Sequence, residues 1–298
     1  MVRPSTLIAL GALAATAVAC APASETTTQA SPASSSASGA SGSATAPSAC
    51  AKDGLALKTP GKLTIGTDKP AYDPWFSDDD PSNGKGFESA VAYAVAGQLG
   101  FTRDEVTWAT VKFDSAFAPG AKQFDFDVNQ VSVTPDRAKV VDFSKGYYTV
   151  KQAVVALDGS KVASATDLAG LKDAKIGVQV GTTSLQAVKD VIQPSSELNV
   201  YNEQIDAVNA LKNKQVDAVV VDLPTAFYVT AAQVENSKIV GQFGAASGEP
   251  EVFGAVFEKG SPLVSCVDEA IDKLTASGEL AKIETEWLGS AAGAPELK

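Results

Sequence analysis

Two residues of opposite charge each follow an apolar run typical of a buried strand. Arg137 comes shortly after Phe126–Val131, and Asp222 comes directly after Val216–Val221. A guanidinium presents five fixed donors and matches a carboxylate through two parallel bonds, so Arg137 suits the capture of a small anion. Each residue also has a simpler interpretation, because Arg137 could be a surface residue after a turn and Asp222 could cap a following helix.

Small hydroxyl residues follow other expected strands in the same way. Thr67 and Asp68 follow Leu63–Gly66, and Ser132 follows the run that ends at Val131. The segment 181–184, Gly-Thr-Thr-Ser, follows a further strand and reads as a helix start that could hold an anion or simply cap the helix. Ligands of open α/β sheets bind outside the carboxyl ends of strands. Four such strand ends therefore predict one binding site.

The elements that must position these residues alternate between strand and helix. Strands are expected at Lys62–Gly66, Val106–Phe113, Phe126–Val131, Val154–Leu157, Ile176–Val180, Val216–Val221 and Phe253–Phe257. Helices are expected at 87–99, 182–192, 205–211, 264–274 and 278–288. Alternation with nearly continuous apolar strands predicts α/β lobes with mainly parallel sheets and flanking helices.

Composition excludes several classes of function. The 298 residues carry a formal charge of −11, which argues against nucleic acid as a partner because that partner requires a basic face. The chain has no histidine, which removes histidine-based metal sites and the Ser-His-Asp type of nucleophile activation. It also has no P-loop sequence, so it is not the ATPase of a transporter. We expect no cofactor and no metal.

The N-terminal residues differ from the rest. Residues 1–20 combine Arg3 with a short apolar run, which is typical of a signal peptide. They end in Ala-Val-Ala-Cys, which resembles a lipobox and predicts lipid attachment at Cys20; ordinary secretion with loss of Cys20 is the alternative. Residues 21–49 are nearly all Ala, Ser, Thr, Pro and Gly, which predicts a flexible tether. The protein is therefore expected outside the cell membrane and anchored to it.

With Cys20 lipidated, two cysteines remain. Cys50 and Cys266 lie near the two ends of the region expected to fold. In an oxidising compartment they are predicted to form a disulfide, which requires both ends to lie in one lobe. Two independent buried thiols are the alternative.

The segment from Phe124 to Tyr148, FDFDVNQVSVTPDRAKVVDFSKGYY, resembles the family 3 solute-binding proteins of ABC transporters, which bind amino acids. That family typically has a strand, then S-[IV]-T-x-x-R, then a stretch like V-D-F-S-x-x-Y-Y. The resemblance implies a two-lobed periplasmic-binding-protein-like fold of type II. It places lobe one at 50–149 plus 250–298 and lobe two at 150–249. The crossings are expected near Thr149–Gln152 and Gly244–Val252, and the lobes should close on the ligand.

The resemblance also assigns roles to the charged and hydroxyl residues. It implies that Arg137, Thr182 and Thr183 bind the carboxylate of an α-amino acid. It implies that Asp222 binds the α-ammonium.

The aromatic positions follow from the same resemblance. Tyr72 would cover the ligand and Phe113 would form the opposite wall, because aromatic rings supply apolar walls and cation–π contact. Trp75 either joins this wall or packs in the core, and Phe76 is expected in the core. Glu88 is expected to be structural.

Asn129 and Gln130 stand where the family often has small residues. Longer amides there either narrow the pocket or read a polar side chain. Asp68 lies near the expected site, and Lys69 is the only basic residue there besides Arg137. This balance of charge favours a polar or basic amino acid as the ligand.

The predicted function is that of a monomeric, lipid-anchored receptor that delivers an amino acid to an ABC permease and is not an enzyme. One alternative is a dehydratase of prephenate-like acids, which needs a positioned general acid. Another is a ligand-sensing module.

Overall fold

The computed structural model describes residues 50–289 and 293–298. The signal peptide, the lipid at Cys20 and the tether expected at 21–49 fall outside these ranges. Within them, no helix has the length and apolar character needed to cross a membrane.

The first of two five-stranded sheets has the strand order β2-β1-β3-β10-β4. Its strands are β1 (Leu63–Thr67), β2 (Val106–Thr110), β3 (Phe126–Asp127), β4 (Val141–Val150) and β10 (Glu251–Glu258). β1 runs parallel to β2 and β3, whereas β10 is antiparallel to both β3 and β4. Four of the five strands therefore point the same way, and their carboxyl ends lie along one edge.

The second sheet repeats this plan in the order β7-β6-β8-β5-β9. Its strands are β5 (Gln152–Leu157), β6 (Ile176–Gln179), β7 (Asn199–Tyr201), β8 (Ala218–Asp222) and β9 (Ser237–Phe243). β6 runs parallel to β7 and β8, and β5 is antiparallel to β8 and β9. In each sheet the single reversed strand, β5 or β10, is the one that begins after a crossing between the lobes.

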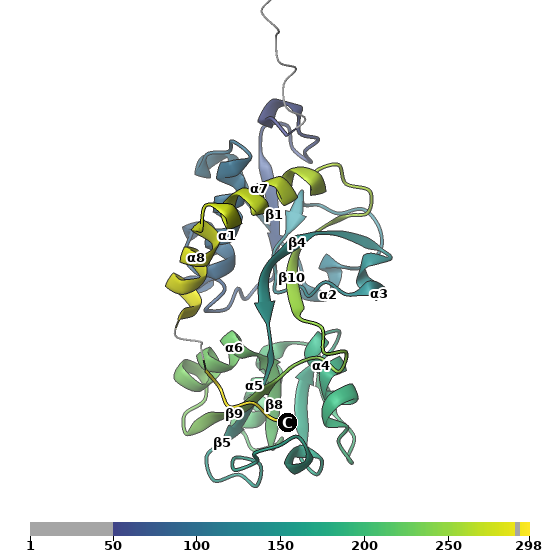
Figure 1. The fold of residues 1–298 in the computed structure, drawn as a ribbon, viewed down its shortest axis with the longest axis vertical. Coiled ribbons are helices and arrows are strands. Elements are labelled where there is room, and N and C mark those ends of the chain that lie inside the picture. The colour runs from purple at the N-terminus through teal and green to yellow at the C-terminus, as the bar shows by residue number, and fades with distance from the viewer. Residues whose placement is uncertain (1–49, 290–292) are drawn as a thin grey trace, which may run out of the picture. The chain divides into compact units, whose positions relative to one another are not determined.

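Helices flank both sheets. In the first lobe α1 (Phe87–Gln98), α7 (Val264–Ala276) and α8 (Glu279–Leu288) contact one another, as Figure 1 shows. The short helices α2 (Phe113–Ala116) and α3 (Pro135–Ala138) belong to the same lobe. The second lobe carries α4 (Thr183–Ala187), α5 (Gln204–Lys212) and α6 (Leu223–Tyr228). The predicted fold class, two α/β lobes with mainly parallel sheets and flanking helices, is confirmed.

One strand is much shorter than its apolar run suggests. The expected strand Phe126–Val131 pairs in the sheet only at Phe126–Asp127. Gln130 adopts a positive φ of 49°, and its backbone N–H donates to Oε1 of Glu88 at 2.7 Å instead of to a neighbouring strand. The chain therefore leaves the ladder where the candidate site begins.

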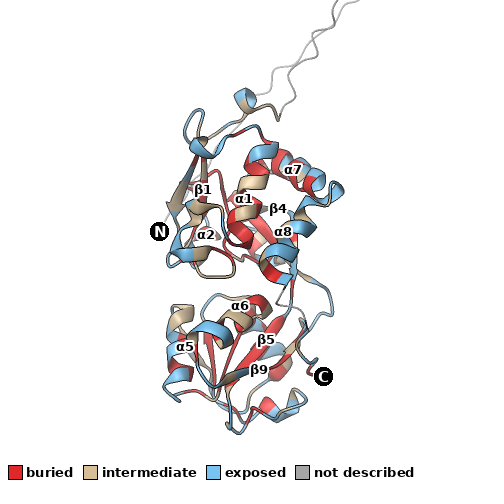
Figure 2. Ribbon diagram, turned by 90° about the vertical axis from the view of Figure 1, so that its left-hand side faces the viewer, coloured by how far each residue is buried: buried red, intermediate tan, exposed pale blue. Residues whose placement is uncertain are grey.

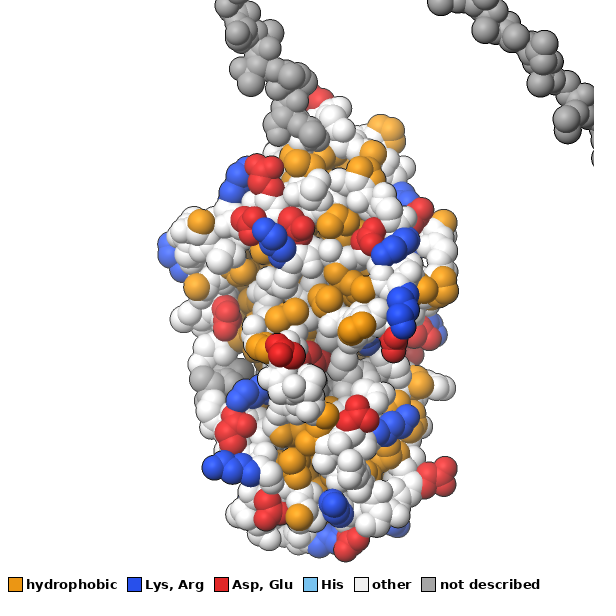
Figure 3. Space-filling view, turned by 45° about the vertical axis from the view of Figure 1, so that its right-hand side comes forward, with side chains coloured by type: hydrophobic (Ala, Val, Ile, Leu, Met, Phe, Trp, Pro, Cys, Tyr) orange, Lys and Arg blue, Asp and Glu red, His pale blue; other side chains and the backbone are white. Residues whose placement is uncertain are grey.

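Both sheets are buried on their faces, as the red strands in Figure 2 show. Leu63 and Ile65 of β1 are fully buried, as are Val154 and Val155 on opposite faces of β5. Figure 3 shows acidic and basic side chains interspersed over one face of the molecule. Exposed pairs such as Lys145–Asp272, at 2.5 Å, are screened by solvent and contribute little, so burial of the apolar strands dominates stability.

The predicted disulfide is confirmed, because Cys50 and Cys266 are bonded. Cys266 lies on α7 and is 4% exposed, within the apolar core of the first lobe. The bond ties the start of the folded region to the penultimate helix.

The chain passes from the first sheet to the second between Val150 and Gln152, and returns between Phe243 and Glu251. Residues 293–298 differ from the expected division, because they lie against the second lobe although 250–298 were assigned to the first. Leu297 is 5% exposed in the second lobe's core, and its N–H donates to the carbonyl of Gln242 at 2.9 Å. The apolar side chain of Leu297 is therefore buried because residues 293–298 pack against the second lobe and not the first.

Candidate functional site

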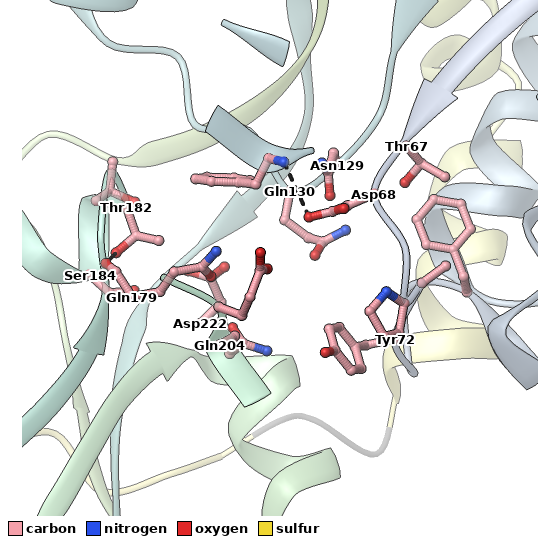
Figure 4. Close-up of a pocket in the computed structure, with 16 residues that line it drawn as sticks. Thr67, Asp68, Tyr72, Asn129, Gln130, Gln179, Thr182, Ser184, Gln204 and Asp222 are labelled. Carbon is pink, nitrogen blue, oxygen red and sulfur yellow. Dashed lines mark hydrogen bonds between the residues drawn. The ribbon is translucent and has the colours of Figure 1, made fainter. Parts of the chain in front are cut away.

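A cavity of about 50 Å³ lies between side chains from the carboxyl ends of strands in both sheets. Figure 4 shows Asp68, Asn129 and Tyr72 on one side and Thr182 and Ser184 on the other. Of the residues predicted for the site, the cavity is lined by Asp68, Tyr72, Phe113, Asn129, Gln130, Thr182, Thr183 and Asp222. Strand ends of both sheets thus converge as the sequence pattern requires.

Trp75 does not line the cavity, and neither do Ser132 and Arg137. Trp75 is 1% exposed and packs edge-on against aromatic rings of the first core, including Phe253 at a centroid distance of 5.5 Å. Its Nε1 donates to Oγ1 of Thr225 at 2.9 Å. The structure therefore places Trp75 in the core, which was the second of its two expected positions.

Arg137 lies behind the cavity and is 8% exposed. Its Nη1 donates to the carbonyl of Ser132 and its Nη2 to the carbonyl of Gly181, both at 2.8 Å. The guanidinium carbon is 4.1 Å from the centroid of the Phe117 ring. Burial lowers the pKa of Arg137 to about 10, so the side chain stays cationic near neutral pH. It is a buried cation that joins the two lobes, with donors left over for an anion.

The hydroxyls at the start of α4 serve different partners. Thr182 is the N-cap of α4, where its Oγ1 accepts from the N–H of Leu185 at 3.1 Å. The same hydroxyl donates its only hydrogen to the carbonyl of Gln179 at 2.8 Å. Thr183 Oγ1 lies 3.2 Å from Oγ of Ser132, which belongs to the other lobe. Because Ser132 donates its only hydrogen to Glu251, Thr183 is the donor in this contact, so the hydroxyl hydrogens of both threonines are engaged within the protein.

Asp222 is positioned at the end of β8 and immediately before α6. It occupies the N-cap position of α6, yet its side chain makes no capping hydrogen bond. Instead Oδ1 accepts from Nε2 of Gln152 at 2.9 Å. Burial raises the pKa of Asp222 to about 8, and the carboxylate of Glu251 acts in the same direction. A nearby cation would offset that cost, so the site favours an ammonium group.

The cavity wall that includes Tyr72 also contains Asp68, Phe113 and Glu203. Asp68 accepts from the N–H of Lys69 at 2.7 Å and from that of Phe113 at 3.1 Å, which fixes its carboxylate beside the cavity. Burial raises the pKa of Tyr72 to about 12, and the carboxylates of Glu203 and Asp68 add to this shift. An aromatic ring between carboxylates from both lobes is a favourable environment for a cation.

Two polar side chains in the wall have unpaired buried atoms. Nδ2 of Asn129 and Oγ1 of Thr67 have no hydrogen-bond partner among the described residues, although the residues are 5% and 2% exposed. Buried polar atoms of this kind cost about 1–3 kcal/mol each unless a partner arrives. Gln130 differs, because its side-chain amide donates to Oε2 of Glu88. Asn129 and Thr67 are therefore the groups most in need of a ligand.

Several lining residues were missed at the sequence level. Gln179, Glu203 and Gln204 line the cavity, at the ends of β6 and β7. The strand-end rule would have found Gln179, but β7 is only three residues long and gives no recognisable pattern. Gln152 and Glu251 were also missed as site residues; both hydrogen-bond to groups of the site from the crossings.

A second cavity, of about 350 Å³, shares Phe113, Gln179 and Glu203 with the first. It is lined further by Lys112 and by the carboxylates of Asp114 and Asp206. No group of three His, Cys, Asp or Glu residues in the described ranges could hold a metal ion.

Residues 63–290 match the family described as bacterial extracellular solute-binding proteins, family 3. The L-cystine-binding protein TcyA of Bacillus subtilis (strain 168) is 30% identical over 80% of this chain and 87% of its own length. The arginine-binding extracellular protein ArtP of the same organism is 29% identical over 81% of this chain and 92% of its own. The solved structure of an ancestral arginine-binding protein bound to glutamine is 32% identical, has a TM-score of 0.64, and covers 78% of this chain and 99% of that one.

The named relatives are amino-acid-binding proteins rather than enzymes. The family match spans both lobes and the segment that carries Arg137. The chain belongs to family 3 of the bacterial extracellular solute-binding proteins.

Proposed function

We propose that this protein binds an α-amino acid between its lobes and delivers it to an ABC permease. The observation that carries the proposal is the partly buried carboxylate of Asp222, which lines a cavity whose opposite walls come from different lobes. A buried carboxylate without a cation is costly, and the α-ammonium of an amino acid would supply that cation. Family membership supports the same ligand class and an extracytoplasmic location.

The carboxylate of the ligand would lie near Thr183 and Arg137. Thr183 lines the cavity, and Arg137 lies behind it with two of its five donors engaged by carbonyls. Three donors of Arg137 are left for the ligand while the side chain keeps its bond to the carbonyl of Gly181. Because that bond crosses between lobes, ligand binding and lobe closure would be coupled through it.

The side chain of the ligand is proposed to be polar or basic. Asp68 and Glu203 supply two carboxylates to the cavity, and among the described residues no Lys or Arg lines it. Asn129 and Thr67 supply unpaired polar atoms. The second cavity continues past Phe113 and leaves space for a long side chain.

The test is a thermal-shift panel of the twenty amino acids with cystine, ornithine and citrulline, followed by calorimetry. A ligand at 100 times its Kd should stabilise the protein by about 2.7 kcal/mol. Absence of any shift across the panel would remove the proposal. The dehydratase and sensing alternatives are less well supported because the named relatives are binding proteins.

We further propose that the protein works as a monomer held at the membrane by lipid on Cys20, a residue outside the described ranges. Radiolabelled palmitate should enter the wild-type protein and not the Cys20→Ser variant. Equal labelling of both would show that the anchor is wrong without affecting the binding proposal.

A further inference from the structure

Two carboxylates at the boundary between the lobes share a single amide. Gln152 begins β5 and is 0% exposed, and Glu251 begins β10. Nε2 of Gln152 donates to Oδ1 of Asp222 at 2.9 Å and to Oε2 of Glu251 at 3.0 Å. An amide nitrogen has two hydrogens, so these bonds use both and hold the two acids side by side.

The position of this amide is fixed from both lobes. Oε1 of Gln152 accepts from Oγ of Ser184 at 2.6 Å, so both ends of the amide are engaged in hydrogen bonds. Oε1 of Glu251 accepts from Oγ of Ser132 at 2.5 Å. The bonds form one chain that begins in the first lobe, passes through both crossing strands and ends at the residue proposed to bind the ammonium.

The other charged groups around Asp222 act in both directions. Burial and the carboxylate of Glu251 raise its pKa most, Glu88 adds to the rise, and Arg137 lowers it. Burial raises the pKa of Tyr148, and the carboxylates of Glu284 and Asp222 add to this rise, so the Tyr148 hydroxyl stays neutral. The pKa of Asp222, about 8, lies above neutral pH.

We propose that Asp222 holds a proton when the site is empty because Glu251 is held beside it, and that binding of a ligand ammonium to Asp222 releases this proton to solvent. Glu251 does not line the cavity, so it acts as a positioning residue through Gln152. The inference rests on the proposed function, because it requires Asp222 to receive the ammonium. Affinity should then rise with pH up to about 8, by as much as tenfold per pH unit where the release is complete.

The test is calorimetry with the best ligand of the panel, in buffers of different ionisation enthalpy between pH 5.5 and 8. The slope of apparent enthalpy against buffer enthalpy counts the protons exchanged. The wild-type protein should release about one proton near pH 6.5 and fewer towards pH 8. In Glu251→Gln, which keeps the shape and removes the charge, the release curve should move to lower pH by about one unit.

Glu203→Gln is the matched control, because it makes the same change at a carboxylate that lines the cavity but is not bridged to Asp222. It should alter affinity for a basic ligand and leave the release curve unchanged. The proposal is wrong if the wild-type protein binds its ligand without releasing a proton, or if the Glu251→Gln curve coincides with that of wild type. Failure of every amino acid to bind would instead remove the proposed function and this inference together. The wild-type measurement decides the question even if Glu251→Gln does not fold.

Discussion

Trp75 and Thr225 join the two lobes through a buried hydrogen bond, in which the indole Nε1 donates to the threonine hydroxyl at 2.9 Å. The two residues are 1% and 3% exposed, so this bond is shielded from water when the lobes are together. Its partners lie before α1 and on α6, which belong to different lobes. The bond therefore favours the closed arrangement.

Thr225→Val should weaken ligand binding, because it leaves Nε1 of Trp75 buried and unpaired in the closed form. That loss costs about 1–3 kcal/mol, which corresponds to roughly a 5- to 150-fold rise in Kd. Calorimetry with the best ligand of the panel measures this rise in Kd. Thr230→Val is a suitable control, since that hydroxyl bonds only to carbonyls of its own segment, at Ala226 and Phe227. Equal Kd values for both variants would show that the bond does not bias closure.

Removing the disulfide should lower thermal stability substantially. The bond joins Cys50 to Cys266 across 216 residues, and in the chain-entropy model a loop of this length contributes about 5 kcal/mol. The double variant Cys50→Ala, Cys266→Ala should therefore melt roughly 10–20 °C below wild type in calorimetric scans. Reductant should produce a similar shift in wild type and none in the variant. A variant that melts with wild type would mean that the unfolded chain gains little freedom from losing the bond.

The strand-end positions of the site could be predicted because apolar strands and the polar residue after each strand leave a clear pattern. Asp68 and Asp222 line the cavity for that reason, whereas Asn129 was expected there from the family resemblance. The partner of Arg137 could not be predicted, because the carbonyl of Gly181 belongs to the other lobe and comes within reach only in the folded arrangement.

Other features depend on contacts that no local pattern records. The apolar run Phe126–Val131 predicts a full strand, but capture of Gln130 by the buried Glu88 ends the pairing early. β7 has three residues and β9 contains Gly241, so neither shows strand periodicity clearly. The sequence does not point to Glu251, because a carboxylate at a crossing is expected to be exposed. In the structure Gln152 and Ser132 both donate hydrogen bonds to it.

Glu88 should make stability depend on pH. Burial raises its pKa from an ordinary value of 4.5 to about 7, although Tyr147 and Gln130 donate hydrogen bonds to it. The folded protein then binds more protons than the unfolded chain between about pH 4.5 and 7. The free energy of unfolding should therefore fall as pH rises through this window, by about 3 kcal/mol from this group.

Urea unfolding at pH 5 and pH 8 measures this dependence of the free energy of unfolding on pH. Glu88→Gln, which cannot ionise, should reduce the fall by about 3 kcal/mol, whereas buried acids such as Asp127 keep their own contribution in both proteins. Glu286→Gln removes a charge from an exposed position of α8 and should keep the wild-type slope. Identical slopes in all three proteins would show that Glu88 does not titrate in this range.

Asp222 and Arg137 are expected to hold the two charged ends of the ligand. Asp222→Asn keeps the shape of the side chain and removes its charge, so it should weaken binding and leave the fold intact. Loss of one partner from a buried charge pair costs about 2–5 kcal/mol, or roughly a 30- to 4,000-fold rise in Kd. Arg137→Ala should do the same and also reduce stability, because its bonds to the carbonyls of Ser132 and Gly181 are lost.

Calorimetry on both variants with the best ligand of the panel separates these effects, with urea unfolding to report stability. Amino acids blocked at either the amino or the carboxyl end should bind poorly to the wild-type protein for the same reason. Glu286→Gln serves as a control, because it removes a charge from an exposed position of α8 that does not line the cavity. If Asp222→Asn and Arg137→Ala both bind within about threefold of wild type, a gap of about 0.7 kcal/mol, the ligand is not held by its two charged ends. Tyr72 and Phe113 would then be the main contacts.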